Sequence, residues 1–106
     1  MNIKIIITTT DSNKTANVIA ESLVKDNLSP CIQITTNIHS VYKWKGKLDK
    51  SDEILLLIKT IPEKVHYCKK LILKYHNYDV PELIVTNGEI LNDEYKYWFI
   101  NNSQEI

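Results

Sequence analysis

The sequence predicts an α+β fold in which strands and helices follow one another as β-α-β-β-α-β, with one more helix at the end of the chain. Two short, continuously apolar segments, 3–9 and 54–58, are typical of central strands that are covered on both faces. The segments 16–24 and 65–75 repeat their apolar residues at helical spacing. Between these helices lies a long two-stranded arm, 30–60, that folds back on itself. We expect residues 1–106 to form a single domain.

A change of period separates the first strand from the first helix. Ile3 to Thr9 is short and rich in β-branched residues, as buried strands are. Asp11-Ser12 then offers a side chain that can cap a helix N-terminus, and Asn27 can end that helix in the left-handed conformation. The expected core face of the helix consists of Ala16, Ile19, Ala20, Leu23 and Val24.

The arm begins with strict alternation of apolar and polar residues, the period of a strand with one buried face. This period places Tyr42 and Trp44 on the same strand face as Ile32 and Ile34. The reversal is expected at Lys45-Gly46-Lys47, because glycine adopts positive φ without steric cost.

The length of the arm indicates that it bends or projects. Residues 30–44 would span ~50 Å as a straight strand at ~3.3 Å each, whereas a compact domain of this size is roughly 33 Å across. We therefore expect a bulge at Thr36-Asn37, or an arm that extends beyond its own domain. Tyr42 and Trp44 lie near its tip, where we interpret them as anchors for a partner in preference to residues that stack on a ligand.

The second half of the chain repeats the pattern of helix and strand. Pro62-Glu63 suits the first turn of a helix, and the core face that follows is Val65, Cys68, Leu71, Ile72 and Tyr75. After a loop over 76–81, we expect a last strand from Glu82 to Thr86 and a turn at Asn87-Gly88. Asn92 can cap a third helix, with two acidic residues in its first turn. The apolar stripe expected on that helix is Tyr95, Trp98 and Phe99.

Right-handed connections place the first and third strands at the centre of the sheet and both main helices on one face, which is a ferredoxin-like sandwich. Leu55 and Leu57 then point away from the helices, opposite to Ile54, Leu56 and Ile58. This second apolar face needs a cover, and a neighbouring subunit would provide it.

Composition excludes several classes of protein. The 106 residues are 43% apolar and 25% charged, with 13 basic and 13 acidic residues and no arginine, so neither a nucleic acid nor a membrane surface is an expected partner. The first residues lack the length and cleavage site of a signal peptide. Cys31 and Cys68 are far apart and are not in Cys-x-x-Cys spacing. We therefore expect a reduced protein of the cytoplasm.

Several motifs together resemble the CutA divalent-cation tolerance family. They are residues 28–32, the segment Ser-Val-Tyr-Lys-Trp-Lys-Gly-Lys at 40–47, 53–60 ending in Lys-Thr, His-Asn-Tyr at 76–78, Pro-Glu at 81–82, and Asn92-x-x-Tyr95-x-x-Trp98. The resemblance implies a homotrimer of ferredoxin-like subunits, similar to the PII signalling proteins. It also implies a role in tolerance of, or response to, divalent metal ions, with copper binding in some members.

The positions assigned to copper in some bacterial relatives are altered here. Those relatives carry a Cys late in the first strand and a pair of His residues, where this sequence has Thr8 and Tyr75-His76. His76 alone remains as a metal ligand, so we expect weak copper binding at most. The residues also differ at Asn77, where the family usually has Pro, and at Leu91, where it usually has Gly.

The resemblance further implies a cleft between subunits, formed by Cys31, Tyr42, Lys59, Tyr78 and Glu82, with Trp98 nearby. Lys59 ends a central strand and Glu82 begins the last one, so the sequence predicts that they meet as an ion pair. We interpret this pair as structural in preference to an acid–base pair.

No enzyme is predicted, because the sequence shows neither a nucleophile–base–orienter set nor a phosphate loop. Three hypotheses remain: a metal-tolerance protein that binds metal or a small ligand, an uncharacterised enzyme or small-ligand sensor acting in the cleft, and an interaction scaffold.

Overall fold

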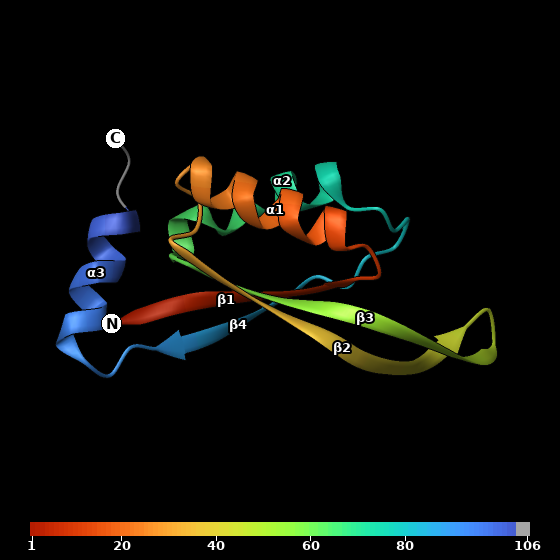
Figure 1. Cartoon of the computed structure of the whole chain (residues 1–106). Coiled ribbons are helices and arrows are strands. Elements are labelled where there is room, and N and C mark those ends of the chain that lie inside the picture. The colour runs from red at the N-terminus through yellow and green to blue at the C-terminus, as the bar shows by residue number, and fades with distance from the viewer. Residues whose placement is uncertain (104–106) are drawn as a thin grey trace.

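The computed structural model describes residues 1–103 and follows the predicted order of elements (Figure 1). The strands are β1 (Asn2–Thr10), β2 (Cys31–Trp44), β3 (Lys47–Thr60) and β4 (Ile84–Glu89). The helices are α1 (Asn13–Lys25), α2 (Val65–Tyr75), which follows a 3₁₀ turn at Pro62–Lys64, and α3 (Asp93–Ser103). Ser12 caps α1 by accepting a hydrogen bond from the Thr15 amide, and Asn27 follows the helix with a φ of 58°, as predicted.

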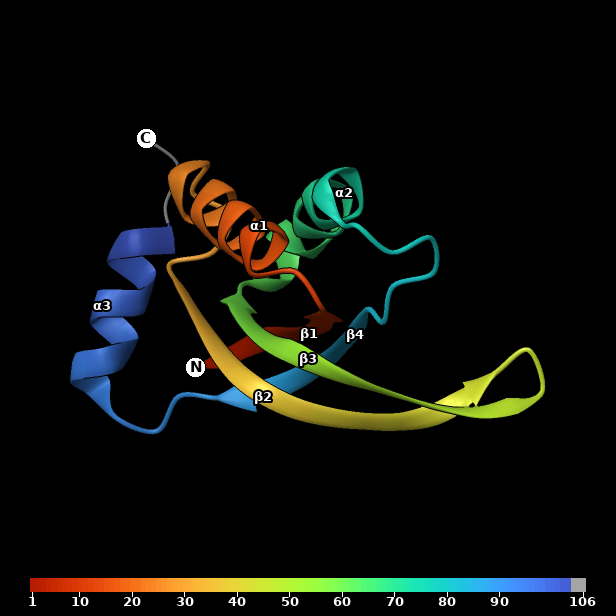
Figure 2. The same ribbon diagram turned by 45° about the vertical axis from the view of Figure 1, so that its right-hand side comes forward.

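The four strands form one antiparallel sheet in the order β2-β3-β1-β4. The two continuously apolar strands, β1 and β3, therefore lie at its centre, which confirms the prediction. Helices α1 and α2 both lie over the same face of the sheet (Figures 1 and 2).

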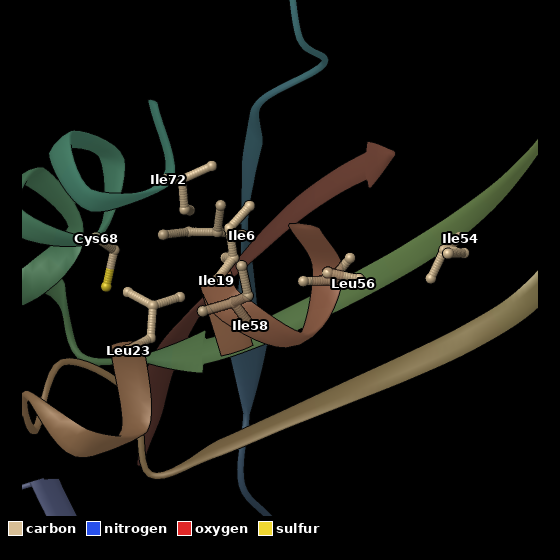
Figure 3. Close-up of a cluster of buried hydrophobic side chains, with 9 residues drawn as sticks. Ile6, Ile19, Leu23, Ile54, Leu56, Ile58, Cys68 and Ile72 are labelled. Atoms are coloured by element: carbon tan, nitrogen blue, oxygen red, sulfur yellow. The ribbon is translucent and has the colours of Figure 1, made fainter. Parts of the chain in front are cut away.

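The main core lies between these helices and the sheet (Figure 3), and its buried residues are Ile6, Ala16, Ile19, Leu23, Ile54, Leu56, Ile58, Cys68 and Ile72. Two predicted core residues are largely outside it. Val24 is 46% exposed because it lies at the edge of the α1 stripe, about 80° from Ala16 around a helix with 3.6 residues per turn. Tyr75, the last residue of α2, is 40% exposed, with the Lys74 ammonium over its ring.

Strands β2 and β3 form an arm that projects from the domain, as Figure 2 shows. The molecule measures 46 × 26 × 21 Å, so its long axis exceeds the roughly 33 Å of a compact domain of this size. The arm reverses at Lys45 and Gly46, which both have positive φ, 51° and 77°. Two successive positive φ values are the signature of the two-residue turn that matches the twist of a hairpin.

The predicted bulge is present, and it reverses the faces of the strand. Thr35 pairs with Leu55 but Ile38 pairs with Glu53, and Asn37 between them has a φ of 62°. The extra residue shifts the alternation by one position. The prediction that the tip aromatics share a face with Ile32 and Ile34 is therefore wrong.

Beyond the bulge, β2 presents its even-numbered residues on the face away from α1 and α2. Tyr42 pairs with Asp49 and Trp44 with Lys47, both odd-numbered positions of β3. Leu55 and Leu57 of that strand occupy the same face, because directly paired residues of an antiparallel sheet point to one side. The bulge thus brings the aromatic side chains to the face that α1 and α2 leave uncovered.

The predicted turn at Asn87-Gly88 lies inside β4, which starts at Ile84 and not at Glu82. Gly88 pairs with Ile3. A Cβ at this glycine would lie 3.0 Å from Ile5 Cδ1, so glycine serves close packing here and not a reversal.

Helix α3 packs at the end of the sheet away from the arm (Figure 1). Phe99 is fully buried there, in a second core cluster with Ile3 and Ile90. Trp98 is 43% exposed and stacks on Tyr95 with ring centres 5.5 Å apart, so it is not the core residue that the stripe predicted.

One buried charge connects the ends of two helices. Lys64 is 7% exposed, and its ammonium donates to the carbonyl oxygens of Asn27, at 2.6 Å, and of Ser103. These carbonyls lie at the C-terminal ends of α1 and α3, where the helix dipole favours a cation. Within residues 1–103, no helix is both long enough and apolar enough to cross a membrane.

Candidate functional site

A cleft of about 780 Å³ lies between the arm and the loop that joins α2 to β4. The arm contributes Tyr42, Trp44, Asp49 and Glu53, and the loop contributes Tyr78, Asp79 and Glu82. Both segments can be followed in Figure 2. Because the bulge turns the arm residues toward this side, the geometry of the cleft depends on it.

All charged side chains of the described residues that line the cleft are acidic: Asp49, Glu53, Asp79 and Glu82. Glu53 is the most enclosed of them, at 8% exposed. The hydroxyl of Tyr78 donates a hydrogen bond of 2.7 Å to Glu53 Oε2. Acidic side chains and the aromatic rings of Tyr42, Trp44 and Tyr78 therefore line one cleft, a combination that attracts positive charge.

Tyr78 is held in its protonated form. Burial raises its pKa above the ordinary value, and the hydrogen bond to Glu53 and the negative charge of that carboxylate raise it further. Loss of the proton would place two negative charges side by side. Tyr78 consequently acts as a donor at neutral pH.

His76 fixes the loop through both of its ring nitrogens. Nε2 lies 2.9 Å from the carbonyl oxygen of Thr9, and Nδ1 accepts a 3.0 Å hydrogen bond from the amide of Tyr78. A carbonyl can only accept, so Nε2 carries the hydrogen and Nδ1 offers its lone pair. A metal ion bound to His76 would therefore replace one of these bonds.

Thr8, another altered copper position, and Asn77, which stands where the family usually has Pro, also serve structural contacts. The hydroxyl of Thr8 is buried and donates to the carbonyl of Glu82 at 2.7 Å. Asn77 accepts from the Thr10 hydroxyl at 2.5 Å and donates to Asp11 at 2.7 Å. Among residues 1–103, no three His, Cys, Asp or Glu side chains are placed to hold one metal ion. The described residues therefore do not fit a resident copper ion.

A second group of predicted residues lies near α3. Cys31 and Lys59 are cross-strand partners, and the Lys59 ammonium lies 5.6 Å from the centre of the Tyr95 ring. Tyr95 in turn stacks on Trp98. Burial first, and then Cys31, raises the pKa of Tyr95, and its buried hydroxyl has no hydrogen-bond partner in the described part of the chain.

The structure therefore divides the predicted site in two. Tyr42, Tyr78 and Glu82 line the cleft between the arm and the α2–β4 loop. Cys31, Lys59 and Trp98 gather near α3, as described above. Strands β2 and β3 both run from one group to the other, and the 31–44 span of β2 corresponds to roughly 40 Å at ~3.3 Å per residue.

The predicted ion pair between Lys59 and Glu82 does not form within the chain. The ion pairs among residues 1–103 are His39–Asp52 and Lys96–Asp93. Strands β3 and β4 run parallel to each other because both are antiparallel to β1. Along β1, Lys59 is level with Ile5 and Glu82 lies beside Thr8, so the two side chains are separated both across β1 and along it.

Comparison with known proteins identifies the family. Residues 4–102 match the CutA1 divalent ion tolerance protein family. The divalent-cation tolerance protein CutA of Thermus thermophilus is 31% identical over 94% of this chain and 97% of its own length. The mouse protein CutA is 33% identical over 85% of this chain, which spans about half of the mouse protein.

Solved structures agree with this result. CutA1 of Ehrlichia chaffeensis superimposes with a TM-score of 0.89 at 29% identity, covering 98% of this chain and 97% of that one. CutA1 of the psychrotrophic bacterium Shewanella sp. SIB1 gives 0.90 at 30% identity, covering 97% and 96%. The fold and the sequence thus define one class of protein, small α+β domains with a long hairpin arm. This chain belongs to the CutA1 divalent ion tolerance family.

Proposed function

We propose that this chain forms a homotrimer in the cytoplasm and serves divalent-cation tolerance by binding a ligand in clefts between its subunits. One observation carries the proposal: the six family positions of the site lie in two groups, one in the cleft beside the arm and the other near α3. A neighbouring subunit that brings its Lys59 group to the acidic cleft between the arm and the α2–β4 loop would reunite them. The negative charge of one group and the ammonium of the other support this arrangement.

The surface of the sheet supports the same assembly. Trp44 is 49% exposed and Ile84, on the uncovered face at the sheet edge, is 51% exposed. Apolar side chains exposed in this way are expected where a subunit has lost its neighbours.

We propose binding and not catalysis. Tyr78 is one of two tyrosines that line the cleft, and burial and Glu53 keep its hydroxyl protonated, so it cannot serve as a base at neutral pH. Copper would bind weakly, because His76 must give up a hydrogen bond to become a ligand.

Two measurements test this proposal. Light scattering should give three times the 12.3 kDa of one chain. Calorimetric titration of the trimer with Cu²⁺ should give weak binding that His76→Ala removes, while His66→Ala, a change at an exposed helical position, leaves it unchanged. A stable monomer would falsify the assembly, and tight copper binding that survives His76→Ala would show a different metal site.

A further inference from the structure

The outer side of α2 carries positive charge that no acidic side chain of the helix offsets. Its 11 residues include three lysines and one histidine, but no aspartate or glutamate. Helices α1 and α3, by contrast, each mix lysine with acidic residues. The whole chain has 13 basic and 13 acidic residues, so the composition of α2 is a local separation of charge within a neutral protein.

The charged residues gather on one face of the helix. At 3.6 residues per turn, all exposed residues of α2 except the last, Tyr75, fall within a continuous arc of roughly 160°. The centre of this arc lies opposite Cys68, which is buried in the core with Ile72. We call this arc the basic face of α2, and its members, in order around the helix, are Lys69, Leu73, His66, Lys70, Lys74 and Tyr67.

The fold makes little use of these lysines. The ion pairs among residues 1–103 involve none of them. Lys74 lies in the last turn of α2, where the helix dipole favours a cation, and its ammonium is 5.2 Å from the centre of the Tyr75 ring. Lys69 and Lys70 lie in the middle of the helix, beyond the reach of this effect. Their charge is therefore available to a partner.

The basic face is also separate from the surface that a neighbouring subunit would cover. Helix α2 lies with α1 over one side of the sheet (Figure 1), and its buried residues point toward that sheet. The basic face consequently points away from the sheet. Tyr42, Trp44 and Leu57 belong to the opposite side. A trimer formed through that side would leave the basic face of each subunit open to solvent.

The composition of the face indicates the chemistry of the partner. The three lysines suit carboxylates that are spaced along a peptide, and Leu73, 47% exposed, lies between them and offers apolar contact. Basic helices that bind membranes insert several large apolar side chains, whereas this face presents one leucine and one tyrosine. The chain has no arginine, the residue that binds phosphate groups through two parallel hydrogen bonds. These features favour an acidic peptide over a lipid surface or a nucleic acid.

We propose that the basic face of α2 binds an acidic peptide segment of another protein. Carboxylates of the segment pair with Lys69, Lys70 and Lys74, and an apolar side chain of the segment packs on Leu73. A single face binds weakly, because each exposed ion pair contributes little in water. In the proposed trimer, three copies of the face would bind a multivalent partner more tightly. The inference itself does not depend on the proposed function, since one chain carries the whole face.

The test titrates the full-length, ¹⁵N-enriched protein with a synthetic peptide that repeats glutamate and leucine at helical spacing. We expect saturable shifts of the α2 amide resonances, and none with the same peptide after glutamine replaces every glutamate. Lys70→Gln should weaken binding about 2- to 5-fold, the range of one exposed ion pair, and replacing all three lysines about 10- to 100-fold. The matched control is Lys45→Gln in the turn of the arm, which should leave the affinity unchanged.

Three results would overturn the inference. The first is no saturable shift at millimolar peptide. The second is equal affinity of the Lys70 and Lys45 variants, or shifts spread over lysines of every element, because either would show general attraction of charge. The third is binding to phosphatidylserine vesicles by a protein that ignores the peptide, which would identify a lipid surface. Light scattering on the same samples reports the proposed trimer separately, so either proposal can fail while the other holds.

Discussion

Replacing Trp44 by Ala should act on assembly and leave the fold of the single chain intact. About half of this side chain is uncovered in the isolated subunit. A tryptophan buries up to 150–250 Å², so a neighbour would cover roughly 100 Å² more, worth ~2.5 kcal/mol at ~25 cal/mol/Å². Three copies give about 7 kcal/mol per trimer, or roughly 10⁵-fold in the association constant. This value is an upper bound, since area-based energies overstate burial.

The assay is sedimentation and thermal melting over a hundredfold dilution. Trp44→Ala should dissociate within that range and acquire a melting temperature that depends on concentration, because assembly and folding are linked. Phe99→Ala is the contrasting variant: this ring is fully buried, so its loss should cost ~3–5 kcal/mol of folding stability at any concentration. A Trp44→Ala protein that stays trimeric and melts at one temperature throughout the dilution series would refute the reasoning.

Three further predictions concern the fold and the cleft. Lys64→Met leaves two carbonyls without their charged donor and should lower the free energy of unfolding by ~2–5 kcal/mol in urea titration; an unchanged midpoint, equal to that of exposed Lys70→Met, would contradict this. The folded-state pKa of Tyr78 lies above its ordinary value near 10. Its contribution to the free energy of unfolding is therefore complete below about pH 10 and is lost as the pH rises further. Tyr78→Phe should therefore show a shallower fall of stability above pH 10 than the wild type or Tyr97→Phe, and identical slopes would refute it. Deleting Asn37 removes the bulge, turns the tip aromatics to the other face and should abolish the trimer in light scattering; an unchanged mass would show that the bulge does not orient the arm.

The fold could be predicted because local patterns and chain connectivity agree. The continuous apolar runs in β1 and β3 require two covered faces, and the order of elements allows few arrangements that bury both. Gly88 was misread because glycine signals both turns and close packing. Its neighbours Ile3 and Ile5, which need the space, lie far away in the sequence.

The orientation of the arm could not follow from alternation alone. The bulge position was predicted, yet the strand faces were assigned as though the period continued through it. One inserted residue at Asn37 moves every later side chain to the opposite face. Glu53 lies on β3, where the alternation is unbroken, and it faces the same side as Leu55 and Leu57.

The sequence predicted which residues belong to the site but not where they lie in the fold. The resemblance indicated Tyr42, Tyr78 and Glu82, which the structure brings to one cleft. It also indicated Cys31 and Lys59, which the structure pairs near α3. Their separation depends on the strand directions, which a linear motif does not encode. The burial of Lys64 likewise could not be predicted from the sequence, because a buried lysine is identified only by the carbonyls that surround it in the fold.

The most direct test of the divided site is a mixed trimer. The experiment mixes two kinds of subunit. One kind carries a spin label on Cys31, the free cysteine that is not buried, and the other is unlabelled and ¹⁵N-enriched. Within one chain, Cys31 and Trp44 are the two ends of β2 and are roughly 40 Å apart at ~3.3 Å per residue. If a neighbour completes the cleft, the Trp44 indole resonance of the enriched subunits should lose intensity. Full intensity in a sample whose mass is that of a mixed trimer would contradict the account.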